Sequence, residues 1–492
     1  MHEATMNSHK IIFLSMLASA ITLTYCATNP VTGKKQIVLM SEQQELAMGK
    51  EADPSIISEF GLYPDSNLQR FIREKGNEMA RISHRNNIQY HFRVLDSDVI
   101  NAFAVPGGYV YFTRGILAHM NDEAQFAGVL GHEIGHVTAR HTVSQQTTQT
   151  LAQLGLIAAL ISNKYLAQFA EPASQGLQLM FLKNSRDAEK QADELGVEYS
   201  SKVGYDAREM AKFFQTLERE TAAKSNSRLP EFLSTHPDPG NRFVTVTKLA
   251  SNYQAKNNLN NLKINRDNYL RMVDGVVYGE DPRQGFKQND IFYHPQLRFQ
   301  FNTPPGWQYK NSPTVVNFAQ ADGQAMALLT LAKGNSLEEA AQQFAQQNKL
   351  RINENRRITV NGINALAQQA DVQGQDQSGR VVTSVRVISY FIQYNGTIYK
   401  LVGASTPQLF EQFAPKFALY FGSFKQLTDP AILNIKPERI AIKKIAKAFT
   451  LQLALTSLGV PQARLNEHAI LNGMQLTDQL QAGTLVKVAE RK

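Results

Sequence analysis

The feature that most constrains this chain is an H-E-x-x-H motif at residues 132–136, inside an apolar segment with helical periodicity. On an α-helix, residues four apart lie one above the other, so His132 and His136 can both offer an imidazole nitrogen to one metal ion. Glu133 projects from the same turn, where a carboxylate can take a proton from an attacking water. The pattern predicts a zinc-binding helix.

The residues around the motif are typical of a buried helix. Phe126, Val129, Leu130 and Val137 repeat with a period of about 3.6 residues. Asn121 is a candidate N-cap, and the acidic residues after it suit the positive end of the helix dipole. Two buried histidines and a glutamate need polar partners. A metal ion supplies such partners, and hydrogen bonds within a core are the alternative.

A second motif, S-R-D-A-E-K-Q-A-D at residues 185–193, offers further acidic groups. Glu189 and Asp193 are four residues apart and share a helix face, with Ser185 as a candidate N-cap. A zinc site with two histidines needs a third protein ligand, and Glu189 fits that need. Asp193 can accept the N–H of a ligating histidine and fix its tautomer. Taken alone, these acids would indicate only a solvated helix face.

The two motifs together resemble the M48 zinc metallopeptidases, a family that includes prenyl-protein peptidases and bacterial periplasmic quality-control proteases. The resemblance covers about residues 26–255, and the sequence C-A-T-N-P-V-T-G at residues 26–33 is similar to the lipoprotein members. It implies an α+β fold, with a mainly helical zincin-like (gluzincin) peptidase domain and a small sheet at residues 41–270.

The resemblance also implies site residues. One zinc ion per chain would have three protein ligands: His132, His136 and Glu189. Glu133 would be the general base, and Asp193 would hydrogen-bond to a ligand histidine. These roles agree with the chemistry expected from the two motifs.

A turn at residues 235–242, T-H-P-D-P-G-N-R, matches a histidine and an arginine that the family places six apart near the zinc. The resemblance implies that His236 either reaches the metal and silences the enzyme or stabilises the oxyanion. It implies that Arg242 neutralises charge on the tetrahedral intermediate. The Pro/Gly-rich setting by itself indicates only a turn. His141 follows His136 by five residues, and we expect it to point away from the face that the motif histidines share.

Zinc peptidases commonly hold an extended substrate by adding it to a sheet edge beside the metal helix. Tyr90–Leu95 alternates like a strand, and Phe103–Phe112, with P-G-G inside it, is typical of a hairpin or a bulged strand. We assign the substrate edge to Asn101–Tyr111. The candidate substrate-binding residues are Asn101, Ala102 and Phe103.

The N-terminus has the pattern of an export signal. Residues 1–25 resemble a signal peptide, with an almost wholly apolar run that ends at L-T-Y-C. This ending resembles the bacterial lipobox, which makes Cys26 a candidate lipidation site and residues 26–40 a lipoprotein linker. Tyr25 departs from the pattern, where a small residue is usual, so an ordinary cleaved signal or an uncleaved anchor is the alternative. Cys26 is the only cysteine, which excludes an intramolecular disulfide.

Later segments predict two further units and one hairpin. Residues 285–427 predict an α/β sandwich resembling PsbP/Mog1-like domains, with hairpin turns at two Asn-Gly pairs. Residues 437–492 resemble a small LysM-like module, a fold that binds cell-wall glycan; a plain interaction module is the alternative. The apolar runs Leu151–Ile161 and Leu177–Leu182 are too short to span a bilayer and predict a core helix or a membrane-leaning hairpin.

Charge limits the partners. A formal net charge of +8 suits weak attraction to anionic lipid or cell-wall polymers. No Lys/Arg run or nucleic-acid motif is present in the sequence, so we expect no nucleic-acid partner. With the resemblance, these features predict an exported periplasmic zinc endopeptidase, anchored to the outer membrane as a lipoprotein, with peptidoglycan as a further candidate contact. Its expected substrates are unfolded or misassembled envelope proteins. The alternative is an envelope chaperone or assembly factor with gated or secondary proteolysis.

Overall fold

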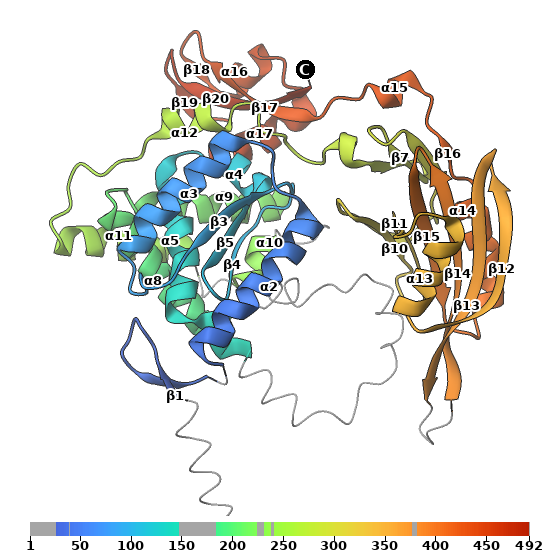
Figure 1. Cartoon of the computed structure of the whole chain (residues 1–492). Helices are drawn as coiled ribbons and strands as arrows, with labels where there is room; N and C mark the ends of the chain where they lie inside the picture. The colour runs from blue at the N-terminus through green and yellow to red at the C-terminus, as the bar shows by residue number, and fades with distance from the viewer. Residues whose placement is uncertain are drawn as a thin grey trace, which may run out of the picture.

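The computed structural model describes residues 26–38, 40–146, 184–223, 231–237, 241–375 and 381–491. The predicted signal peptide and the two apolar runs after the metal helix lie outside these residues. No helix in the described ranges is long and apolar enough to cross a bilayer. Figure 1 shows a mainly helical part, a strand-rich part to its side, and a small C-terminal part that lies against the helical one.

The helical part contains most of the α-helices. In chain order they are α2 (Glu42–Phe60), α3 (Ser66–Arg81), α4 (Arg114–His119), α5 (Glu123–Ala139), α8 (Arg186–Lys202), α9 (Arg208–Ala223), α10 (Glu231–Thr235), α11 (Arg242–Lys256) and α12 (Arg266–Val273). The first begins after Ser41, whose hydroxyl and backbone form a capping box with Gln44. It continues through Pro54 and ends at Phe60.

A small sheet lies beside α5. It consists of β3 (His91–Leu95), β4 (Ala102–Val105) and β5 (Tyr109–Thr113), in the order β3-β5-β4. The strand β5 runs parallel to β3 and antiparallel to β4, which makes the expected hairpin. Gly108 in its turn has a φ of 90°, and a Cβ there would lie 2.5 Å from the Gln89 carbonyl oxygen, so only glycine fits. The hairpin leaves β4 at a sheet edge.

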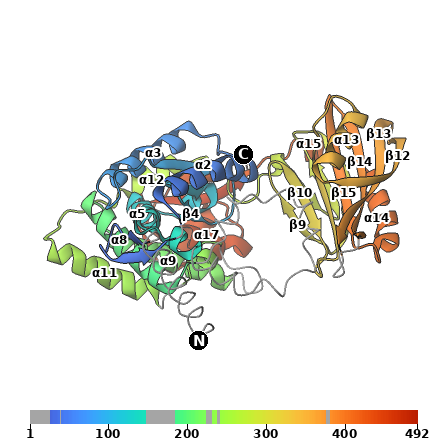
Figure 2. The same ribbon diagram turned by 60° about the horizontal axis from the view of Figure 1, so that its bottom comes forward.

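Glycines allow α5 and α8 to pack at close range, and Figure 2 shows the two helices side by side. A Cβ on Gly196 would lie 3.0 Å from the carbonyl oxygen of Gly128 and 3.1 Å from the backbone nitrogen of His132. A Cβ on Gly131 would lie 3.0 Å from the Gly196 carbonyl oxygen. A glycine inside a helix costs about 1 kcal/mol relative to alanine. Here the glycines let the backbones of α5 and α8 come closer than a larger residue would allow.

Gly196→Ala should therefore force the two helices apart. We expect a loss of about 1–3 kcal/mol in the free energy of unfolding, measured by urea denaturation, and weaker zinc binding. Gly422→Ala is the matched control, because Gly422 ends a helix and a Cβ there meets nothing within 4 Å. The control should be neutral or slightly stabilising. Equal effects of the two changes would contradict the importance of this helix crossing.

Residues 26–37 form a hairpin within the segment for which we expected a linker. The strands β1 (Cys26–Thr28) and β2 (Lys35–Ile37) pair antiparallel. Between them, the Asn29 side chain accepts hydrogen bonds from the backbone of Val31 and Thr32 and donates one to the carbonyl oxygen of Ala139 at 3.2 Å. Because Ala139 is the last residue of α5, the hairpin is attached to the carboxyl end of that helix.

The strand-rich part is built on a seven-stranded antiparallel sheet in the order β12-β13-β14-β15-β11-β10-β9. A second sheet has the order β16-β8-β7-β6. The strands are β6 (Phe286–Gln288), β7 (Ile291–His294), β8 (Phe299–Asn302), β9 (Gln308–Asn311), β10 (Val315–Ala319), β11 (Ala325–Leu331), β12 (Leu350–Val360), β13 (Ile363–Gln375), β14 (Val381–Tyr394), β15 (Thr397–Ser405) and β16 (Lys425–Gln426).

Two helices cover opposite faces of the larger sheet. The helix α13 (Leu337–Gln347) packs on one face through Phe344 against Phe391. The helix α14 (Phe410–Gly422) packs on the other face with Phe417 in a second aromatic cluster. Both Asn-Gly hairpin turns are present, with positive φ at each residue of the pairs. The resemblance to PsbP/Mog1-like domains stays a prediction.

Over its described residues, the C-terminal unit contains two α-helices and four strands. In chain order they are β17 (Glu438–Lys444), β18 (Phe449–Thr450), α16 (Leu451–Ser457), α17 (Leu465–Leu471), β19 (Gln479–Leu480) and β20 (Leu485–Arg491). It is fused to the helical part. Lys487 is fully buried and donates to the carbonyl oxygens of Ala118 and Met120, at 2.7 and 2.8 Å. Ile440 belongs to the hydrophobic core of the helical part. The unit therefore supports the loop that leads into α5, and its likeness to LysM modules stays a prediction.

Candidate metal centre

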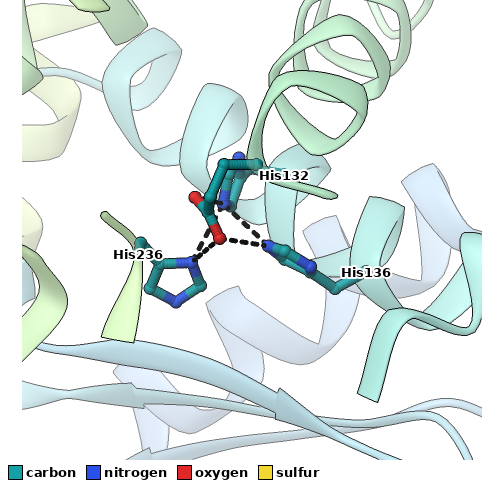
Figure 3. Close-up of side chains that lie close together, drawn as sticks. His132, His136 and His236 are labelled. Atoms are coloured by element: carbon teal, nitrogen blue, oxygen red, sulfur yellow. Dashed lines mark hydrogen bonds and ion pairs between the residues drawn. The ribbon is translucent and has the colours of Figure 1, made fainter. Parts of the chain in front are cut away.

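Four polar side chains meet between α5, α8 and the residue after α10: His132, His136, Glu189 and His236. One donor atom of each lies within 4.8 Å of all the others. Figure 3 shows the three imidazoles pointing toward one another. All four side chains are buried. Imidazole nitrogen and carboxylate oxygen are the donors that zinc accepts in proteins, so the residues present fit this ion.

The two helices supply the three predicted ligands, and the structure brings these together. The Nε2 atoms of His132 and His136 lie 3.0 Å apart, and each lies 3.4 Å from a carboxylate oxygen of Glu189. Burial opposes the charged form of Glu189, but the imidazoles around it, His236 foremost, hold the pKa of this carboxyl well below its usual range. The pKa of His132 is raised to about 9 against the effect of burial, because Asp193 and Glu189 accept its hydrogen bonds. Burial has the opposite result at His136, whose pKa is held well below its ordinary value.

The N-caps fix where these helices start. Asp122, one residue after the expected Asn121, caps α5: its carboxylate accepts from the backbone of Gln125 at 2.7 Å. The Asn121 backbone instead donates to the Gln125 side chain. Ser185 caps α8 as expected, accepting from the backbone of Ala188. The one-residue error in α5 leaves the face of the motif unchanged.

Asp193 is placed to orient His132. Its Oδ1 lies 2.9 Å from His132 Nδ1, the nitrogen on the far side of the ring from the cluster. Arg242 donates to both carboxylate oxygens of Asp193, at 2.9 and 2.6 Å, and its guanidinium lies over the ring of Phe214. Burial opposes ionisation, but the charge of Arg242 keeps the pKa of Asp193 below its ordinary value. Arg242 also lies 3.3 Å from Glu189 Oε2, so it contacts a ligand directly as well as holding Asp193. Its predicted action on an intermediate stays a prediction.

Glu133 is buried beside the ligands without a hydrogen bond. Within the described part of the chain, neither of its carboxylate oxygens has a hydrogen-bond partner. The Nε2 atom of His236 lies 3.6 Å from Glu133 Oε1. Burial raises the pKa of this carboxyl above its ordinary value. An unpaired buried carboxylate is costly, so this position suits a group whose partner is an incoming molecule.

His236 lies among the ligand atoms. Its Nδ1 is 3.0 Å from Glu189 Oε1 and 3.2 Å from His132 Nε2, and its ring stacks on Phe232. Of the two predicted roles, this placement agrees with a histidine that reaches the metal.

The expectation for His141 was wrong. The helix α5 ends at Ala139, and Arg140 adopts the left-handed conformation with a φ of 57°, which turns the chain back toward the helix. His141 Nδ1 therefore lies 2.9 Å from His136 Nδ1. The spacing argument failed because it continued the helix past its end, and no glycine marks that end in the sequence.

Of the candidate substrate residues, Ala102 and Phe103 lie on the edge strand β4, and Asn101 directly precedes it. The Asn101 carbonyl oxygen accepts from the Thr113 backbone at 3.0 Å, so this pair is hydrogen-bonded within the hairpin. In an antiparallel ladder, the backbone groups of successive residues point alternately toward the partner strand and away from it. The backbone groups of Phe103 therefore also face β5, whereas those of Ala102 and Ala104 face the free edge. The Asn101 side-chain amide is buried and lacks a hydrogen-bond partner among the described residues.

Glu189→Gln should reduce zinc occupancy sharply, because a neutral amide is a poor ligand for zinc. The measurement is zinc content per chain after dialysis against a weak chelator. Asp187→Asn, an exposed position on the same helix, is the control and should keep full occupancy. Full zinc content in the Glu189 variant would show that this residue is not a ligand.

Comparisons with known proteins agree with this centre. The pattern described as peptidase family M48 matches residues 66–250. The beta-barrel assembly-enhancing protease of Escherichia coli (strain K12) is 29% identical over 234 residues, 46% of this chain and 47% of that protein. The mitochondrial metalloendopeptidase OMA1 of Homo sapiens is 27% identical over 244 residues, 46% of each chain. The chain spans about half the length of the curated relatives it matches.

Among solved structures, cyanobacterial PsbP from Synechocystis is 12% identical and covers 28% of this chain and 91% of its own, with a TM-score of 0.23. We base no fold assignment on a similarity of this size. The family match is different in kind, because residues 66–250 include both motifs and the turn that carries His236 and Arg242. On this evidence residues 66–250 match peptidase family M48, and the chain is similar over about half its length to proteins named as metalloendopeptidases.

Proposed function

We propose that this chain is a zinc-dependent endopeptidase of the cell envelope, which hydrolyses peptide bonds in unfolded or misassembled proteins. The observation that carries the proposal is the buried set of two histidines and Glu189 beside a carboxylate, Glu133, that has no hydrogen bond. The names of its relatives, a protease and a metalloendopeptidase, support the reaction class. The bacterial relative's name refers to β-barrel assembly, which supports the substrate class.

In the proposed mechanism, His132, His136 and Glu189 hold one zinc ion. Zinc at this position would lower the pKa of a water to about 7 and polarise the scissile carbonyl. Glu133 takes a proton from the attacking water and passes it to the leaving amine. Its burial raises the carboxyl pKa and so helps it to hold that proton between the two steps. Asp193, held by Arg242, keeps His132 in the tautomer that leaves Nε2 free to ligate.

The first test is cleavage of a denatured protein by residues 27–492, with Glu133→Gln as the control. Wild type should cleave, and the variant should be slower by a factor of about 10²–10⁴ while it keeps its zinc. Equal cleavage by both would show that Glu133 is not the base. If neither cleaves, His236→Ala decides between two accounts. Activity in that variant would mean that His236 gates the enzyme; inactivity would favour the chaperone alternative.

We further propose that the free edge of β4 binds an extended substrate. An edge strand presents unpaired N–H and C=O groups that a peptide can extend as a new strand. Here those groups belong to Ala102 and Ala104, on the strand next to α5.

Ala104→Pro tests this edge. Proline is tolerated on an edge strand where the N–H faces outward, so the β4–β5 pairing should survive. Loss of one substrate hydrogen bond should lower kcat/KM by roughly 2–10-fold, with zinc content unchanged. Ala104→Ser keeps the N–H and is the control. An unchanged kcat/KM in the proline variant would place the substrate elsewhere.

A lipid anchor at Cys26 is part of the same proposal, and it would hold the chain in the periplasm at the outer membrane. Asn29, which is hydrogen-bonded to the end of the metal helix, comes three positions after Cys26. At about 3.3 Å per residue, an anchor would keep that end roughly 10 Å from its attachment point. Contact of residues 437–492 with peptidoglycan stays a prediction.

Cys26→Ser should move the exported chain from the membrane fraction to the soluble fraction of a cell extract, as followed by immunoblotting. The mass of the wild-type N-terminal peptide should show the acyl groups. A wild-type chain with unmodified Cys26 would contradict the anchor and leave the peptidase proposal intact.

A further inference from the structure

The ring nitrogen of His136 that faces away from the ligand cluster, Nδ1, has a partner of its own. His136 Nε2 faces the ligand cluster, and its Nδ1 lies 2.9 Å from His141 Nδ1. The other nitrogen of His141, Nε2, lies 2.9 Å from the side-chain oxygen of Gln191. Gln191 comes from α8, two residues after Glu189. A chain of three side chains therefore runs from α8 back to the metal ligand on α5.

The chemistry of these groups sets the position of each proton. The amide oxygen of Gln191 can only accept, so His141 Nε2 must carry a hydrogen. A neutral imidazole that carries its hydrogen on Nε2 has a bare Nδ1, which can only accept. His136 Nδ1 must donate to it, because one proton lies between two nitrogens at this distance. The Nε2 of His136 is then left with its lone pair directed at the cluster.

We propose that His141 and Gln191 are positioning residues that fix His136 in its metal-binding tautomer, as Asp193 does for His132. This inference rests on the proposed zinc site and adds two residues to it. His141 is not itself a ligand, since both of its nitrogens are occupied by His136 and Gln191.

The turn that delivers His141 is held by long-range contacts. Arg140, in its left-handed conformation, donates to Glu45 at 2.8 Å, and Arg85 also binds the Glu45 carboxylate. Both Arg140 and Glu45 are buried. The Asn29 side chain binds the last carbonyl of the helix at the same place. A non-glycine residue held at positive φ by buried ion pairs is a feature that the surrounding structure maintains.

The test is zinc affinity of residues 27–492, measured by competition with a chromophoric chelator. His141→Leu removes the acceptor and should weaken zinc binding by about 10–100-fold. His141→Asn keeps an oxygen where Nδ1 was and should recover most of that loss. Gln191→Leu should weaken zinc binding by a smaller factor. Because Gln191 is only half-buried, this variant should fold, so it keeps the test valid if a His141 variant does not fold.

A second readout separates positioning from general stability. Long-range ¹H–¹⁵N spectra report which nitrogen of His136 carries the proton, and the wild-type zinc form should show Nδ1–H. In His141→Leu the fraction of that tautomer in the metal-free protein should fall, with the circular dichroism spectrum unchanged. If zinc affinity and the His136 tautomer are unchanged in both leucine variants, the proposed positioning role of His141 and Gln191 is overturned. A wild type that binds no zinc would overturn the proposed metal site as well.

Discussion

The close crossing of α5 and α8 is the constraint on which the centre depends. Backbone atoms of the two helices approach so closely at Gly131 and Gly196 that a methyl group would not fit without displacement. Only at this separation can carboxylates on α8 reach imidazoles on α5. One helix supplies two histidines and Glu133, and the other supplies Glu189, Gln191 and Asp193. Each ligand of one helix thus has a partner on the other.

The centre is a buried polar network, in which His132 and His136 have hydrogen-bond partners of different kinds. His132 is backed by a carboxylate whose charge Arg242 compensates. His136 is backed by an imidazole and an amide, without a formal charge. In a low-dielectric interior each unpaired group would cost several kcal/mol, so such a network is stable only when nearly all of its members are bonded. Among the described carboxylates of the centre, Glu133 differs, because neither of its oxygens has a hydrogen-bond partner. Such an unsatisfied group is expected at a functional position, here that of the base in a hydrolytic reaction.

The sequence predicted those parts of the centre that depend on local periodicity. Residues four apart on a helix share a face, and that rule alone pairs His132 with His136 and Glu189 with Asp193. The P-G-G turn between two apolar runs likewise predicts the hairpin between Ala102 and Thr113. These inferences hold because each needs only the geometry of one element.

Features that depend on distant contacts could not be predicted in this way. The reversal at Arg140 requires a buried ion pair with Glu45, ninety-five residues earlier in the chain. The hairpin that replaces the expected linker depends on Asn29 and the end of α5. The C-terminal unit looked independent in sequence, yet Lys487 is buried against the loop before the metal helix. None of these long-range contacts produces a pattern in the local sequence from which it could be predicted.

The most direct test of the account is a crystal structure of the wild-type chain grown with zinc, with anomalous data collected on both sides of the zinc absorption edge. The account predicts one zinc peak, bonded to Nε2 of His132, Nε2 of His136 and the carboxylate of Glu189. A peak at other residues, or none at this cluster, would contradict it.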